Sequence, residues 1–255
     1  MYYNAKLWIL AACTFGLILC SCNNSTKKTN NKDVVADPED MDESAGEKIE
    51  TILLLADKNN GKIEDSIQLM AYKPVNDFYN QNKFAPVWSK EAKWSLVADS
   101  LFDFIKNAQL YGLFSQDYHF NNLVSVKNKL DKDSLLQMDA SLWGKADIML
   151  TDALVKIMKD LKYGRLQKDS IILSKDSLLG KDFYVKNLKE IIEENQFTAV
   201  LNSVQPQHTA YWELKKGIKG FLDSMDTRKY TYISYPYKKN NKQDSIRFIT
   251  SLQKG

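Results

Sequence analysis

The longest regular pattern of apolar residues in the chain runs from Leu142 to Arg165. Its apolar side chains recur at steps of three and four, the spacing of one face of a helix of about six turns. They are Leu142, Ala146, Met149, Leu150, Ala153, Leu154, Ile157, Met158 and Leu161. Asp147 and Asp160 fall outside this series, and Gly164 stands where a helix cap is expected. Such a stripe needs partners on several sides, so we expect this helix to centre an α-helical core.

Shorter helical patterns flank this segment. We expect helices over residues 47–56, 74–82, 94–109, 123–130, 184–194, 197–204 and 208–225. Pro74 suits the first turn of the second helix. Gly217 and Gly220 each cost about 1 kcal/mol relative to Ala, which suggests close packing in the last helix. The fold class is therefore all-α.

The remaining segments lack helical periodicity. Pro86 disfavours helix before it, so residues 83–88 are expected to form an extended link. Residues 165–180 are expected to form a loop. Tyrosines alternate over residues 229–237, which is the pattern of at most one short strand near the C-terminus.

The first 22 residues have the organisation of a secretory signal. Lys6 precedes the apolar run Leu7–Leu19, which is too short to span a bilayer because a spanning helix needs about 20 residues. The run ends in Leu19-Cys20-Ser21-Cys22. Leucine at −3, a small residue at −1 and cysteine at +1 resemble the bacterial lipobox, so we expect removal of residues 1–21 and lipidation of Cys22. An ordinary signal peptide with incidental cysteines is the alternative.

Lipidation would leave the mature chain without a thiol, because Cys13 and Cys20 leave with the signal. Residues 22–46 are polar and are expected to form a disordered tether between membrane lipid and a helical domain over residues 47–237. Removing Lys6 lowers the net charge from +3 to +2, so nothing favours nucleic acid as a partner.

Candidate catalytic groups are few. His119 and His208 each lie beside aromatic residues, and we expect structural roles for both. No HExxH, GxSxG or Gly-rich phosphate loop occurs, so no cofactor or metal ion is expected. Glu190, Glu193 and Glu194 are expected on a solvated face, with a glycan-hydrolysing pair about 5 to 9.5 Å apart as the alternative. The aromatic residues that would stack on sugars or fill the core are Tyr79, Trp88, Trp94, Tyr111, Tyr118, Trp143, Tyr211 and Trp212.

Four motifs in order resemble the N-terminal scaffold domain of YkuD-type murein L,D-transpeptidases. In that family they read approximately FY…PxW, GLxPxxYH, LTxAxxxYxxxLxxGR and LxPxHxxYxxL. The matching residues here are Phe78, Tyr79, Pro86 and Trp88; Gly112, Leu113, Tyr118 and His119; Leu150, Thr151, Ala153, Leu161, Gly164 and Arg165; and Pro206, His208, Tyr211 and Leu214. Ser115 replaces the usual proline, and Met158 lies near the usual aromatic position. The resemblance spans residues 47–237.

The resemblance implies a helical platform that, in complete relatives, precedes a peptidoglycan-binding module and a catalytic domain. That domain attacks a stem-peptide amide with a cysteine thiolate in an SHGCxR-like motif. This sequence has no cysteine after Cys22, so catalysis is not expected from the chain as it stands. Residues 238–255 resemble a linker and the start of a truncated binding module.

The favoured function is that of a lipoprotein of the bacterial cell envelope with its domain in the periplasm. It would carry the non-catalytic scaffold domain of an L,D-transpeptidase, either as a truncated relative or as an adaptor. Its expected partners are membrane lipid, through the acyl anchor, and peptidoglycan or a separate catalytic chain. The alternatives are a periplasmic glycan- or peptide-binding module and a carboxylate-based peptidoglycan hydrolase.

Overall fold

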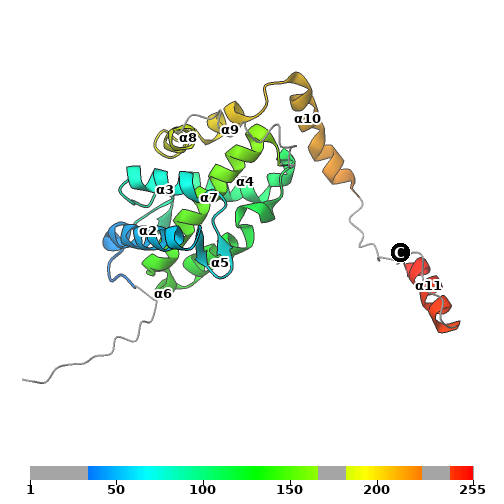
Figure 1. Cartoon of the computed structure of the whole chain (residues 1–255), viewed down its shortest axis with the longest axis horizontal. Coiled ribbons are helices and arrows are strands. Elements are labelled where there is room, and N and C mark those ends of the chain that lie inside the picture. Colours follow the sequence, from blue (N-terminus) through cyan, green and yellow to red (C-terminus); the bar gives the residue numbers. More distant parts are fainter. Residues whose placement is uncertain (1–33, 166–181, 226–241, 255) are drawn as a thin grey trace, which may run out of the picture. The chain divides into compact units, whose positions relative to one another are not determined.

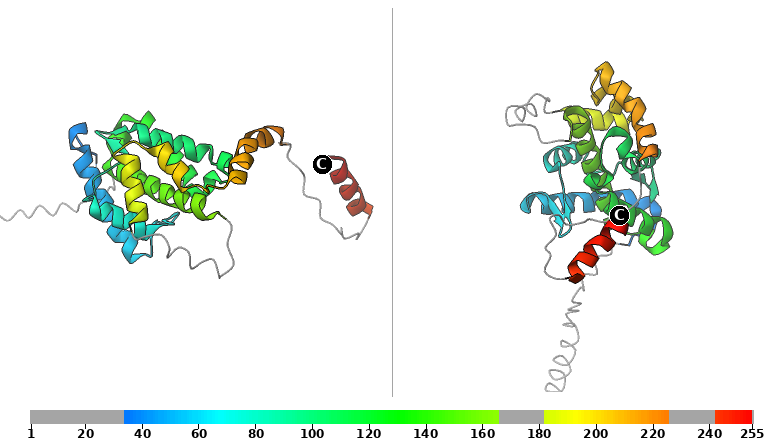
Figure 2. Two further views of the ribbon diagram at one scale, coloured as in Figure 1. Left: turned by 90° about the horizontal axis from the view of Figure 1, so that it is seen from above. Right: turned by 90° about the vertical axis from the view of Figure 1, so that its right-hand side faces the viewer.

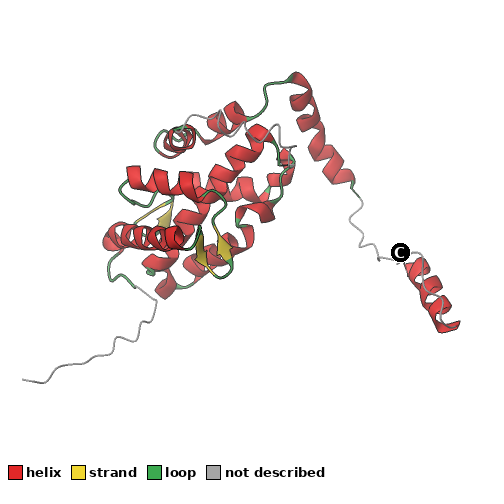
Figure 3. Cartoon of the chain, viewed as in Figure 1, coloured by secondary structure: helices red, strands yellow, loops and turns green. Residues whose placement is uncertain are grey.

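The computed structural model of the chain describes residues 34–165, 182–225 and 242–254. Within them helices dominate, and strands are confined to two short antiparallel pairs (Figure 3). The expected mainly α-helical fold is confirmed. Cys22, the loop expected at 165–180 beyond Arg165, and the strand expected at 229–237 lie outside the described residues.

Helix α7 (Ala140–Tyr163) is the centre of the core, as expected. The Asp139 side chain caps it by accepting from the N–H groups of Ser141 and Leu142, and Gly164 follows its end with φ 82°. Six helices of the described part of the chain gather around α7 in Figures 1 and 2. Those that contact it are α2 (Met41–Lys58), α3 (Tyr72–Gln81), α4 (Leu96–Lys106), α5 (Phe120–Lys132), α8 (Phe183–Ile192) and α9 (Phe197–Val204).

Helix α2 begins earlier than the sequence pattern indicated. It starts at Met41, after the 3₁₀ turn η1 (Pro38–Asp40), so the expectation of a disordered tether through residue 46 is wrong for its last residues. Met41 and Ala45 continue the buried series of Ile49 and Leu53 on the face that contacts α7. Their burial stabilises a helical turn that the acidic composition of residues 37–44 conceals.

Gly144 lets α2 and α7 approach closely. A Cβ atom at this position would lie 3.1 Å from the carbonyl oxygen of Ala45 and 3.3 Å from the backbone nitrogen of Ile49. A side chain at position 144 would therefore clash with the backbone of α2. Backbone atoms cannot avoid the clash by changing rotamer, so the helices would have to separate.

Two hairpins not expected from the sequence interrupt the helices. Strand β1 (Lys62–Glu64) pairs with β2 (Ile67–Gln68), and β3 (Ser89–Lys90) pairs with β4 (Lys93–Trp94). Glu91 and Ala92 turn the second hairpin with φ values of 48° and 58°, the conformation of a two-residue loop whose twist suits a hairpin. Glu and Ala rarely adopt positive φ, so nothing in the sequence indicated a turn at these two positions.

The remaining helices follow the expected order with shifted ends. The Ser95 hydroxyl accepts from the Ala98 N–H at 3.1 Å, so α4 begins at Leu96 rather than at Trp94. The segment between α4 and α7 consists of the 3₁₀ turns η2 (Ala108–Tyr111) and η3 (Ser115–Tyr118), α5 and the short α6 (Ser134–Gln137). Gly112 ends η2 in the left-handed region, with φ 69°.

Helix α10 (Thr209–Ser224) is amphipathic but has no buried residue. Its exposed apolar side chains include Leu214 and Phe221, and Met225, the residue that follows the helix, is exposed as well. A Cβ atom at Gly217 or Gly220 would have no neighbour within 4 Å, so the expectation of close packing there is wrong. Helix α11 (Lys242–Lys254) occupies most of the segment expected to begin a binding module. No described helix has the length and apolar character needed to cross a membrane.

Candidate functional site

The polar residues of α7 hold the loops of the domain in place. Asp147 accepts hydrogen bonds from the Tyr79 hydroxyl at 2.5 Å, the Trp88 N–H at 2.9 Å and the Val87 N–H at 3.1 Å. One turn later, the Thr151 hydroxyl accepts from the Trp88 indole Nε1–H at 2.9 Å and lies 2.8 Å from the Tyr79 hydroxyl. This network joins α3 and the 83–88 link to α7 in a buried environment.

Burial perturbs both acidic groups of this network. Desolvation raises the pKa of Asp147 to about 7, against the opposing effect of the three donors. Desolvation and the nearby Asp147 carboxyl raise the pKa of Tyr79 well above its ordinary value. The phenol therefore stays protonated and acts as a donor throughout the physiological range.

Asp152 forms a second anchor, on the opposite side of α7. Its carboxylate accepts from the Met70 N–H at 3.0 Å and the Ala71 N–H at 2.7 Å, and it lies 2.7 Å from His119 Nε2. The His119 side chain is 8% exposed and its carboxylate partner is fully buried. His119 also has a left-handed backbone, with φ 56°, and begins α5. The expected structural role of His119 agrees with this placement.

A third anchor lies near the C-terminal end of α7. The Tyr118 hydroxyl donates to Asp160 at 2.9 Å, and Lys156 pairs with the same carboxylate. Burial and the Asp160 charge raise the pKa of Tyr118, so this phenol is also a permanent donor. Beyond the helix, Arg165 pairs with Asp117 and lies over the Phe114 ring at 4.2 Å.

A model of a family described as the Scaffold domain matches residues 73–218, more than half of the chain. This is the scaffold domain of L,D-transpeptidases. The chain belongs to this family. No catalytic-domain family model matches, and no curated protein or solved structure matches.

The anchors of the scaffold domain are built from the sequence motifs that carried the resemblance. Tyr79 and Trp88 of the first motif bind Thr151 of the third, and Tyr118 and His119 of the second bind aspartates of α7. Three motifs that are far apart in the sequence thus contribute to one system of contacts. In this chain these motif residues hold the surrounding segments against α7.

The fourth motif of the scaffold domain begins α10. The His208 Nδ1 atom accepts from the Ala210 N–H at 3.2 Å and caps the helix, while the Tyr211 hydroxyl donates to Gln205 at 2.8 Å. Leu214 of the same motif is 77% exposed. His208 is exposed and its imidazole serves a helix terminus, which agrees with the structural role expected for it.

The sequence analysis missed the three aspartates of α7. Asp147, Asp152 and Asp160 are 1%, 0% and 5% exposed, although Asp147 and Asp160 were assigned outside the buried stripe. The available signal was the four-residue spacing of Asp147 and Thr151, which places two polar groups on one face of a helix with a broad apolar stripe. Aspartate at such a position implies donors that arrive from neighbouring segments.

The candidate carboxylates lie at the surface, whereas the candidate aromatic residues are divided between the core and partly accessible positions. Glu193 and Glu194 are exposed, and Glu190 lies 3.6 Å from Lys186 one turn away on α8. The fully or almost fully buried aromatic residues are Tyr79, Trp88, Tyr118 and Trp143. Those that remain partly accessible are Trp94, Tyr111, Tyr211 and Trp212. The described residues contain no group of three or more potential metal ligands.

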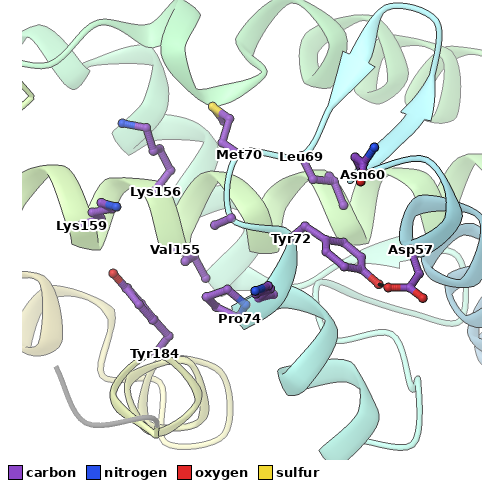
Figure 4. A pocket seen from close by; sticks show the side chains of 12 residues that line it. Asp57, Asn60, Leu69, Met70, Tyr72, Pro74, Val155, Lys156, Lys159 and Tyr184 are labelled. Atoms are coloured by element: carbon purple, nitrogen blue, oxygen red, sulfur yellow. Dashed lines mark hydrogen bonds between the residues drawn. The ribbon is translucent and has the colours of Figure 1, made fainter. Parts of the chain in front are cut away.

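A pocket of about 590 Å³ opens beside the Asp152 anchor (Figure 4). Its walls come from the end of α2, the segment that leads into α3, one face of α7 and Tyr184 of α8. Three lysines line it: Lys73, Lys156 and Lys159. The Tyr72 hydroxyl donates to Asp57 at 3.0 Å on the opposite side, and burial together with this bond raises the pKa of Tyr72 to about 12. The pocket is the concave site of the scaffold domain with the clearest binding chemistry.

Proposed function

We propose that this chain is a membrane-anchored lipoprotein of the cell envelope whose scaffold domain serves as a non-catalytic platform in peptidoglycan cross-linking. The acyl anchor is attached to Cys22 and holds the domain in the periplasm. The platform positions a separate L,D-transpeptidase chain or its peptidoglycan substrate. Membership of the scaffold-domain family is the observation that carries this proposal.

The contacts of the domain support a positioning role. Tyr79, Tyr118 and His119 are each engaged by an aspartate of α7, and their side chains fix loops instead of facing solvent. A buried polar system with all of these donors satisfied gives a rigid core in one arrangement. Rigidity suits a platform, because a surface that is already ordered loses less entropy when it binds a partner.

Lipid attachment is tested by labelling cells with a palmitate analogue. The lipobox-like context predicts incorporation into the wild type and none into Cys22→Ala, which also retains its signal. Cys20→Ala is the matched control, and it should be labelled like the wild type. Equal labelling of Cys22→Ala would contradict attachment at this residue.

The role in the cell wall is tested by removing the chain from its host. The expected result is a lower proportion of 3→3 cross-links in purified sacculi, measured by chromatography of muropeptides. Reintroducing the wild-type chain should restore the proportion, whereas the Cys22→Ala chain should not. An unchanged muropeptide profile after removal would contradict the proposal.

A peptide-binding role is the second candidate, because one observation favours it specifically. The pocket at α7 combines three lysines with an apolar wall in a single concave site. Such a site suits a ligand with both charge and apolar surface.

A further inference from the structure

The pocket beside α7 is held open by contacts outside its lining. Leu69, Met70 and Ala71 form one wall, and the Asp152 carboxylate fixes the last two through their N–H groups at 3.0 and 2.7 Å. Asp152 is itself held by His119. Since these bonds join groups of the protein itself, the fold orders this wall of the pocket.

The positive charge of the pocket lies on one face of α7. Lys156 and Lys159 are one turn apart, and Figure 4 shows both on the same side, with the hydroxyl of Tyr184 directed toward them. The Lys156 side chain is 26% exposed, and it pairs with Asp160, which is 4% exposed. This pairing fixes the ammonium group, which has three N–H donors and so retains donors for a second acceptor.

The start of α3 adds to this field. Tyr72, Lys73 and Pro74 are its first residues and all line the pocket, and no side chain caps this end. A helix N-terminus carries a partial positive charge that favours an anion. The one carboxylate in the lining, Asp57, lies across the pocket and accepts the Tyr72 hydroxyl. Of the described residues, three lysines and one carboxylate therefore line the pocket, and Asp160 behind the lining pairs with one of the lysines.

The pocket is too large for a simple anion. A volume of about 590 Å³ lies in the range of sites for ligands of several hundred daltons, roughly 300–1,000 Å³. Its accessible apolar surface comes from Pro74 and from Met70, which is 40% exposed, whereas Leu69 and Val155 behind them are buried. A suitable ligand has several carboxylates joined by an extended, partly apolar backbone.

We propose that this pocket binds a short peptide with several carboxylates, the chemistry of a peptidoglycan stem peptide, through Lys156 and Lys159. The inference rests on the cell-wall function proposed above and names the ligand of that platform. Lys73 and the first turn of α3 contribute to the positive field, and Met70 and Pro74 contact the aliphatic part of the peptide.

The test is calorimetric titration of the full chain, in mild detergent, with the tetrapeptide stem released from purified sacculi. Replacing both lysines in Lys156→Gln/Lys159→Gln should weaken binding at least about tenfold, because charge-assisted hydrogen bonds to carboxylates are lost. The matched control is Lys216→Gln/Lys219→Gln, which removes two lysines at the same spacing from the exposed face of α10 and should leave the dissociation constant unchanged.

A change in the ligand makes the test independent of folding. The same tetrapeptide with its carboxylates amidated should bind the wild-type chain at least about tenfold more weakly. Absence of binding to the wild type, equal binding of the amidated peptide, or equal binding by a folded Lys156→Gln/Lys159→Gln chain would each overturn the proposal. Displacement of the peptide by equimolar inorganic phosphate would also overturn it, because the pocket would then recognise simple anions.

The two proposals fail separately. If removal of the chain changes 3→3 cross-links but the tetrapeptide does not bind, the platform function stands and the ligand assignment is wrong. If removal leaves the cross-links unchanged, the proposed function itself is wrong.

Discussion

Thr151 is the residue on which two segments of the core converge. Its hydroxyl accepts from the Trp88 indole, contacts the Tyr79 hydroxyl and lies 3.1 Å from the carbonyl oxygen of Asp147. Threonine is not a strong helix former, and it is fully buried in the middle of α7. A threonine at this position provides a hydroxyl partner for the Trp88 indole N–H and the Tyr79 hydroxyl, which are both buried beside α7.

Replacing this hydroxyl tests its contribution. Thr151→Val keeps the shape but leaves the Trp88 indole N–H without its acceptor, and should lower the free energy of unfolding by about 1–3 kcal/mol. Thr51→Val is the control, since Thr51 makes the same bond to the residue four positions earlier on an exposed face. It should change stability by less than about 0.5 kcal/mol in urea titrations. Equal effects would argue against the network.

Asp147 makes stability depend on pH. Its folded pKa of about 7 lies above the ordinary 3.8, so between these values the folded state binds more protons than the unfolded state. Stability should therefore fall as pH rises through this window, by at most about 1.4 kcal/mol per pH unit from this group.

Asp147→Asn should be less stable overall, because an amide NH₂ would face donors, and should lack this pH-dependent contribution. Unfolding free energies at pH 5 and pH 8 measure it: the wild type should lose more stability between them than Asp147→Asn. The exposed Asp65→Asn is the control and should behave like the wild type. Parallel curves for Asp147→Asn and the wild type would show that the Asp147 carboxyl does not titrate here.

At the level of elements, the crossing of α2 and α7 determines the shape of the core. Gly144 faces the backbone of α2, whereas Gly217 of α10 has open space around it. The two glycines therefore have opposite effects on stability. Gly144 allows α2 to pack closely against α7, whereas Gly217 only lowers the helix propensity of α10.

Alanine at each position separates these effects. Gly144→Ala should lower the melting temperature, because its Cβ atom would lie 3.1 Å from the Ala45 carbonyl oxygen and push the helices apart. Gly217→Ala should raise the stability of α10 by up to about 1 kcal/mol. Thermal unfolding followed by circular dichroism measures both. A higher melting temperature for Gly144→Ala would mean that α2 shifts without cost.

For the whole molecule, the placement of histidines and cysteines bears on whether the chain could catalyse acyl transfer. The two histidines serve an aspartate and a helix terminus, and the three cysteines all lie in the first 22 residues. Acyl transfer through a thiolate needs a cysteine with a lowered pKa in a polar site. In the lipoprotein proposed above, the one remaining cysteine, Cys22, is a thioether.

We therefore expect the purified full chain to leave sacculi unchanged. Incubation followed by chromatography should show neither new 3→3 cross-links nor exchange of D-amino acids, with a complete L,D-transpeptidase as the positive control. New cross-linked species would contradict the non-catalytic role. New glycan fragments would instead favour the hydrolase alternative and direct mutation to Glu190, Glu193 and Glu194.

The sequence alone determined the helical class, the central helix and the family. Each depends on local periodicity or on short motifs: the stripe from Leu142 to Leu161 predicted α7, and the four ordered motifs indicated the scaffold domain that the family match confirmed. Lipidation of Cys22 stays a prediction from the signal-like N-terminus.

Tertiary structure decided what the polar residues do. From the local sequence pattern, Asp147 and Asp152 would be assigned to the surface. They are buried acceptors because Trp88 and the segment Met70–Ala71 pack against α7 and donate hydrogen bonds to them. The first turn of α2 likewise exists because Met41 meets the core. The pocket beside α7 required four elements that are distant in the sequence: α2, α3, α7 and α8. Periodicity records which face a helix buries, but hydrogen-bond partners and cavities depend on contacts that form only when distant segments meet.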